Sequence, residues 1–130
     1  MAAIATRGDK LGSVLKYEQA PEHGYCRATK SVTLTPTSEI GDVLYDNAGN
    51  LALVNVVNTA GAEAILIDKE VYNKRPSTGT ANVELAVLVR GAAIVADASL
   101  NYAADVDTPA EKAAVNAVLE GLGILVRSQV

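Results

Sequence analysis

The chain has 130 residues, of which 49% are apolar; it contains five Tyr, no Trp and no Phe, and its formal net charge is −4. This length fits one domain with a tail, and its core must consist of Ala, Val, Leu and Ile. Such a core lacks the aromatic anchors of ligand pockets and nucleobase platforms, which argues against a small-molecule enzyme and a single-strand nucleic-acid binder. The acidic balance disfavours a DNA-wrapping or membrane-surface role.

The charges are unevenly distributed along the chain. Residues 1–30 carry five basic and three acidic side chains, a net +2, whereas the remaining hundred residues carry six basic and twelve acidic ones, a net −6. Cys26 is the only cysteine, which excludes an intrachain disulfide and gives no sign of a secreted disulfide framework. We expect the protein to mature in a reducing compartment or wherever a partner takes it. We expect no signal peptide, because "MAAIATRGDK" has no apolar core, and no stretch that spans a membrane.

Residues 1–30 show no sustained hydrophobic periodicity and are interrupted by Gly and Pro. Two interpretations stay open: a poorly ordered terminus, or an arm that becomes ordered on a partner, for example as an added strand. If the segment is an arm, its binding residues are the cations and apolar side chains around "KLGSVLKY", namely Arg7, Lys10, Leu11, Val14, Leu15 and Tyr17.

From Ser31 onward, short β-type runs alternate with turn signals. The turn formers "DNAGN" predict a hairpin over 42–57, "EAILIDKEVY" predicts a strand with a polar break at 68–69, and "ANVELAVLVRGAAIV" predicts a long apolar strand. Strands at this spacing predict a compact, mainly antiparallel β body.

Arg90 and Gly91 interrupt that last strand. A glycine inside a strand often marks a bend or bulge, and we expect one here. Arg90 then has two interpretations: a polar contact at or near a subunit interface, or an exposed arginine whose stem covers apolar surface. Arg90 and Gly91 are therefore candidate interface residues.

One helix is strongly indicated near the C-terminus. Thr108 is typical of an N-cap, Pro109 of the first helical position, and Glu111 of the third residue of a capping box. Val115, Val118, Leu119 and Leu122 then recur on one helical face, and "ILVR" returns to a strand.

The sequence contains no strong catalytic or metal-binding pattern. His23 and Cys26 resemble half of a zinc site, but two ligands are missing, so we interpret them as mobile residues of the N-terminal tail. Asp105, Asp107 and Glu111 are explained by helix capping. We expect no enzymatic activity, no cofactor and no metal.

The segments "IGDVLYDNAGNLALVN", "AEAILIDKEVY" and "ELAVLVRGAAIV", followed by a short helix and "LGILVR", resemble in order and spacing the lambda-type head decoration proteins of tailed bacteriophages. The family motifs are matched by Leu88-Val89-Arg90-Gly91 and by Gly123-Ile124-Leu125-Val126-Arg127, and the resemblance covers residues 31–130. The chain departs from the family pattern at Ala64, where many members have Gly.

The resemblance implies a mainly β fold with one short α-helix (α+β), a β-clip-like domain over 31–130 preceded by an extended capsid-binding arm over 1–30, and a homotrimer. It also implies a cement protein that is made in the host cytoplasm. Its trimers would sit on the outside of the expanded head at local threefold sites, bind the major capsid protein through their arms, and contact neither nucleic acid nor membrane directly. Alternatives are another trimeric phage accessory protein, such as a head-fibre base or tail component, and a small β-rich binding module.

Overall fold

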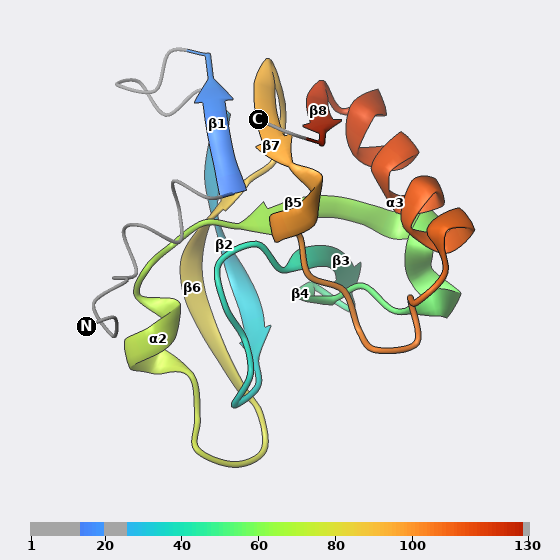
Figure 1. The fold of residues 1–130 in the computed structure, drawn as a ribbon. Coiled ribbons are helices and arrows are strands. Elements are labelled where there is room, and N and C mark those ends of the chain that lie inside the picture. The colour runs from blue at the N-terminus through green and yellow to red at the C-terminus, as the bar shows by residue number, and fades with distance from the viewer. Residues whose placement is uncertain (1–13, 20–25, 129–130) are drawn as a thin grey trace, which may run out of the picture.

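The computed structural model describes residues 14–19 and 26–128. This part of the chain is mainly β, with short helical segments between strands (Figure 1). The strands are β1 (Leu15–Glu18), β2 (Arg27–Leu34), β3 (Val43–Asn47), β4 (Asn50–Leu53), β5 (Ala62–Leu66), β6 (Ala81–Leu88), β7 (Ala93–Ala96) and β8 (Ile124–Arg127). The helical segments are η3 (Val56–Gly61), α2 (Val71–Lys74), η4 (Asp97–Ser99) and α3 (Pro109–Gly121).

Five strands close into a small barrel in the order β2-β4-β3-β5-β6. The longest pairing joins β2 and β6 antiparallel, from Arg27 opposite Leu88 to Leu34 opposite Ala81. Within the barrel, the one parallel pairing is that of β2 with β4, at a single position. The expected mainly antiparallel β body is thus confirmed, and closing the barrel joins its two outer strands, β2 and β6, to each other.

The hairpin expected over 42–57 is confirmed, although it is shorter than predicted. β3 and β4 pair antiparallel around a turn in which Ala48 and Gly49 both have positive φ, 55° and 96°. The Gly49 amide donates to Asp46 Oδ1 at 2.9 Å, which fixes the turn. β4 ends at Leu53, because Asn55 then caps η3.

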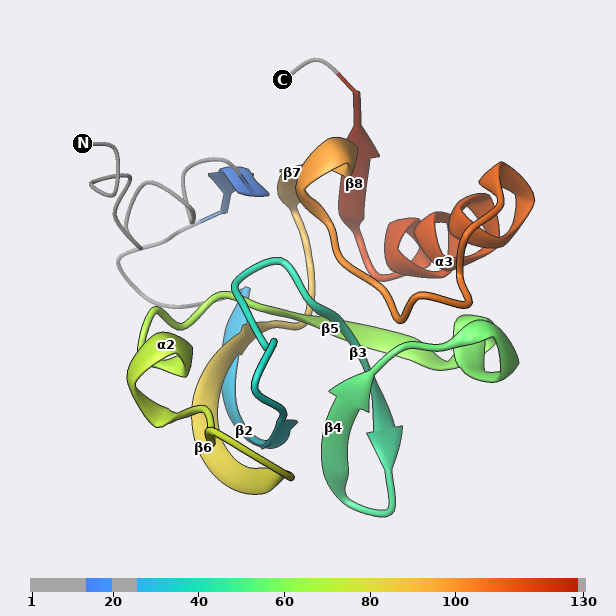
Figure 2. The same ribbon diagram turned by 60° about the horizontal axis from the view of Figure 1, so that its bottom comes forward.

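The remaining strands form a second sheet in the order β1-β7-β8. Figures 1 and 2 show this sheet above one end of the barrel, with α3 beside it. β7 pairs antiparallel with β1 and parallel with β8, so residues from both ends of the chain lie beside the strand that follows Gly91. One continuous apolar core joins the barrel, this sheet and α3; it includes Val14, Leu66, Leu119 and Ile124.

The expected helix begins and ends close to its predicted limits. Thr108 Oγ1 accepts the Glu111 amide at 3.2 Å, and Glu111 Oε1 accepts the Thr108 amide at 3.2 Å, which forms the predicted capping box. Val115 and Leu119 are buried, whereas Leu122 lies beyond the last helical residue and is partly exposed.

The strand expected over 63–72 ends earlier, at Leu66. The expectation of a single helix is also wrong, because the described residues contain short helical segments besides α3. Asp68 Oδ1 accepts the Glu70 amide at 2.9 Å, and Asp68 Oδ2 accepts the Ala86 amide at 3.1 Å. The Asp68 carboxylate therefore turns the chain out of the strand and into α2, at the polar break that the sequence contains.

The N-terminal segment also differs from the expected extended arm. Residues 15–18 form β1 within the second sheet, and residues 27–30 are the first half of β2. A division of the chain at Ser31 would therefore cut through a barrel strand that pairs with β6 along its whole length.

The Thr108 cap allows a first test of the fold. Thr108→Ala removes the side-chain acceptor of the Glu111 amide, and we expect the free energy of unfolding to fall by about 1 kcal/mol. Urea denaturation measures the change. Thr78→Ala, in the exposed loop before β6, is the control and should have no measurable effect; equal losses in both variants would contradict the role of the cap.

The same cap predicts a pH dependence. Hydrogen bonds from the backbone amide of Thr108 and from that of Asp107 lower the pKa of Glu111 below its ordinary value. Because the pKa is lower in the folded state, the charged carboxylate stabilises the protein above its unfolded pKa, and this contribution disappears as the pH falls through the folded pKa. We expect Glu111→Gln to be less stable than the native chain at pH 7 and equally stable once the pH lies below the folded-state pKa of Glu111, as measured by denaturation series across the acid range.

Candidate functional site

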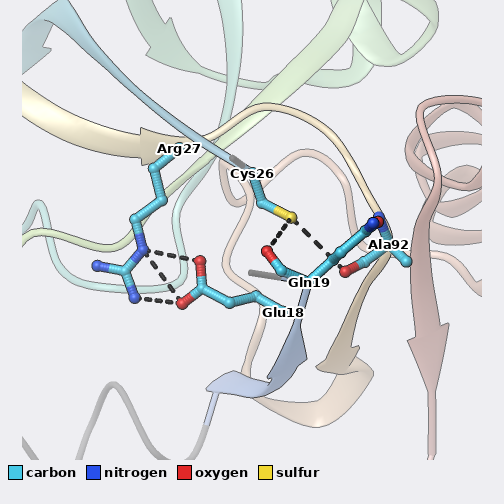
Figure 3. A network of polar contacts seen from close by, with 5 residues as sticks. All are labelled: Glu18, Gln19, Cys26, Arg27 and Ala92. Carbon is cyan, nitrogen blue, oxygen red and sulfur yellow. Dashed lines mark hydrogen bonds and ion pairs between the residues drawn. The ribbon is translucent and has the colours of Figure 1, made fainter. Parts of the chain in front are cut away.

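An ion pair between Glu18 of β1 and Arg27 of β2 links β1 to the barrel (Figure 3). Arg27 Nε lies 3.2 Å from Glu18 Oε1 and 2.9 Å from Oε2, and Nη2 also contacts Oε1. The Glu18 side chain is buried, whereas that of Arg27 is about one-third exposed. The hydrogen bond to Glu18 raises the pKa of Arg27 despite partial burial, so the guanidinium stays charged and compensates the buried carboxylate.

Gln19 extends this attachment beyond the end of β1. Its amide donates to the Ala92 carbonyl at 2.7 Å, and its side-chain Oε1 accepts the Ala92 amide at 3.3 Å. The pairing of β1 with β7 is thus continued by one residue, onto the bend that precedes β7.

Cys26 is not a mobile tail residue, which corrects the interpretation from sequence. It is fully buried, and its Sγ lies 3.6 Å from the carbonyl oxygens of both Gln19 and Ala92 (Figure 3). Its own carbonyl accepts the amides of Val89, at 2.8 Å, and Arg90, at 3.4 Å. A small, weakly polar side chain suits this position, because it fills the junction of the two sheets without leaving a strong donor unsatisfied.

His23 lies outside the described residues. Within residues 14–19 and 26–128, no three His, Cys, Asp or Glu side chains come together as a metal site.

The bend after β6 brings Gly91 against Gly123. A Cβ at position 91 would lie 1.7 Å from the Gly123 carbonyl oxygen, and the Gly91 amide donates to the Leu122 carbonyl at 2.9 Å. Gly123 itself has φ +88°, a conformation that favours glycine. The expected bend is confirmed, because β6 ends in the barrel at Leu88 and β7 begins in the other sheet at Ala93. Sequence reasoning missed the contact between the two glycines, for which "RG" and "GLG" were the only signals.

Of the six residues predicted to bind a capsid protein, the structure describes three, and their exposure differs. Arg7, Lys10 and Leu11 lie outside the described residues. Val14 is fully buried, so its side chain packs inside the protein instead of facing a partner, and Leu15 is half-buried against the same core. Tyr17 is the one of the three described residues that is exposed, at 52%.

Arg90 is exposed at the bend, and Gly91 is partly exposed. Their role at a subunit interface stays a prediction. Replacement of Arg90 by Ala should lower the oligomer mass at low protein concentration if the interface interpretation is right.

In comparisons with known proteins, neither a protein-family model nor a curated sequence matches this chain. Among the described residues, no helix is long and apolar enough to cross a membrane.

The glycine contact predicts an asymmetric response to alanine. Gly91→Ala places a methyl group inside the backbone of Gly123, so we expect a loss of about 3 kcal/mol or more in the free energy of unfolding. Gly121→Ala is the matched control, because a Cβ there meets nothing within 4 Å. It should be neutral or stabilising by up to about 1 kcal/mol, since Ala is the better helix former. Similar melting curves for both variants would contradict the contact.

The ion pair predicts coupled effects on β1. Arg27→Met leaves the Glu18 carboxylate buried without its partner, and we expect a loss of about 2 kcal/mol, reduced from the fully buried case because Arg27 is partly exposed. The double variant Glu18→Gln/Arg27→Met should lose less than the sum of the two single variants. Hydrogen exchange at residues 15–18 measures whether β1 opens; unchanged exchange in Arg27→Met would show that the pair does not hold the strand.

Proposed function

We propose that this chain is a structural virion protein of the lambda-type head decoration class. Three copies bind the outside of the expanded phage head at local threefold sites and stabilise the shell against the pressure of the packaged DNA. The homotrimer and the β-clip type of fold belong to this proposal. Of the expected fold, the described residues contain the mainly β body; the closed five-stranded barrel was not expected.

The main support for the proposal is that the two sequence motifs of the resemblance contact each other in the structure. Residues 88–91 and 123–127 are separated by a helix in the sequence, yet Gly91 contacts Gly123, and β7 pairs with β8 from Ala93 opposite Ile124 to Ala96 opposite Arg127. The motifs therefore form one structural unit. Two chance matches would have no reason to contact each other in the fold. The contact therefore favours a common origin of this chain and the lambda-type decoration proteins over a chance resemblance.

The attachment of β1 changes the arm that we propose, because Leu15–Glu18 belong to the folded body. β1 is anchored in the body by its pairing with β7 and by the Glu18–Arg27 pair. We therefore assign capsid binding to the residues before Val14 as part of this proposal. Residues 1–13 contain Arg7 and Lys10 against Asp9, and they include Leu11. Their affinity for the capsid protein comes from strand addition and from three arms acting together, which raises effective affinity by roughly 10²–10⁴-fold.

Co-sedimentation with capsid shells tests the function. The shells are expanded, lack the decoration protein, and are assembled from the major capsid protein of the phage that encodes this chain. The full-length chain is compared with a chain that begins at Val14. This truncation keeps every described strand, whereas a start at Ser31 would remove β1 and half of β2.

We expect saturable binding of the full-length chain in multiples of three per local threefold site, and loss of binding without residues 1–13. Binding that survives the truncation would keep the function and move the contact to the body. No binding by the full-length chain would overturn the proposal and favour a β-rich binding module instead.

A further inference from the structure

The β1-β7-β8 sheet presents a row of apolar side chains to solvent. Tyr17 pairs with Ile94, and Ile94 pairs with Leu125, so these three side chains lie side by side on one face of the sheet. The neighbouring row, Ala93 with its partners Glu18 and Ile124, is buried and faces the core. The alternation identifies the first row, which we call the sheet row, as the outer one.

The sheet row is substantially exposed and has basic neighbours. Tyr17 is 52% and Leu125 36% exposed, and Ile94 between them is partly exposed. Lys16 adjoins Tyr17 along β1, and Arg127 follows Leu125 on the same face of β8, where it also pairs with Glu120 at 3.1 Å. An apolar centre that contains a tyrosine, with charges at its edge, has the anatomy of a protein–protein contact.

A second apolar site lies at the start of η3. Val57 is 85% and Val56 37% exposed, and we call this pair the valine knob. Asn55 caps η3 by accepting the amides of Val57 and Asn58, and Asp105 Oδ1 accepts the Val56 amide at 3.2 Å. These hydrogen bonds fix the position of the valine knob. The Asp105 carboxylate beside the knob is negatively charged, whereas Lys16 and Arg127 at the border of the sheet row are positively charged.

The two sites belong to different parts of one body. α3 packs against β8 on one side and against η3 on another, and Figures 1 and 2 both show α3 next to each of them. A contact between the sheet row of one copy and the valine knob of the next would join unlike surfaces. Such a head-to-tail contact closes into a ring when the rotation between copies allows it.

We propose that the sheet row binds the valine knob of a second copy of this chain, with Asp105 of one copy facing the Lys16 and Arg127 border of the other. A second copy fits because it supplies both the apolar surface and the opposite charge. This inference rests on the trimer in the proposed function and names the surfaces that form it. It also assigns Tyr17 to contacts between copies, separate from the capsid-binding residues before Val14.

Sedimentation velocity of the full-length chain without capsids tests the contact, up to about 1 mM protein, the limit of weak association. Four variants are compared with the native chain: Leu125→Glu, Val57→Lys, the double variant, and Thr78→Lys as a control on the exposed loop before β6. Circular dichroism verifies that each variant is folded.

We expect Leu125→Glu and Val57→Lys each to weaken association by about tenfold or more, and Thr78→Lys to leave it unchanged. An equimolar mixture of the two single variants should associate more strongly than either variant alone, because the intact knob of one meets the intact sheet row of the other. The double variant should associate more strongly than either single variant, since the carboxylate introduced in the sheet row then faces the ammonium group introduced in the knob of the next copy.

A native chain that stays monomeric throughout would overturn the inference, as would an oligomer that is insensitive to Val57→Lys. A dimer abolished only by Leu125→Glu would overturn it too, because two sheet rows would then face each other instead. Capsid co-sedimentation is scored separately, so failure of this contact and failure of the capsid function are distinguishable.

Discussion

The backbones of Gly91 and Gly123 approach so closely that no side chain fits at position 91. This contact lets the chain leave the barrel at Leu88 and enter a second sheet at Ala93, with β8 already in register beside it. β1 then pairs with the other edge of β7, so the whole second sheet is organised around the strand that follows Gly91. A side chain at position 91 would push β7 away from β8, and β7 is also the strand with which β1 pairs.

Residues 89–92 at the same bend also form hydrogen bonds with Gln19, directly after β1, and with Cys26. The Cys26 carbonyl accepts the amides of Val89 and Arg90, and the Cys26 thiol and the Gln19 amide both reach the carbonyl of Ala92. Beside these contacts, Arg27 compensates the buried charge of Glu18. The attachment of β1 is therefore polar and specific, and it fixes β1 against the junction of the two sheets.

The sequence was sufficient to predict those elements whose structure depends on residues close together in the chain. The turn at Ala48 and Gly49 and the capping box of Thr108 and Glu111 follow from residues close together in the chain. The place of the bend was also visible locally, at Gly91, although its contact with Gly123 was not. The barrel closure and the pairing of β1 with β7 depend on partners more than about forty residues apart, about which periodicity carries no information. Cys26 was misread for the same reason, since its burial comes from Gln19 and Ala92 meeting above it.

The candidate surfaces follow from how the second sheet is built. A sheet of three strands that rests one face on a core leaves its other face to solvent, and here that face carries Tyr17, Ile94 and Leu125 where polar residues would suit water better. On the barrel strand β6, by contrast, the exposed positions are Asn82 and Glu84. The difference shows that the sequence supplies polar residues to an outward face elsewhere in the fold. The apolar row on the outer face of this sheet therefore supports the proposed contact, in which the sheet row of one copy meets the valine knob of the next.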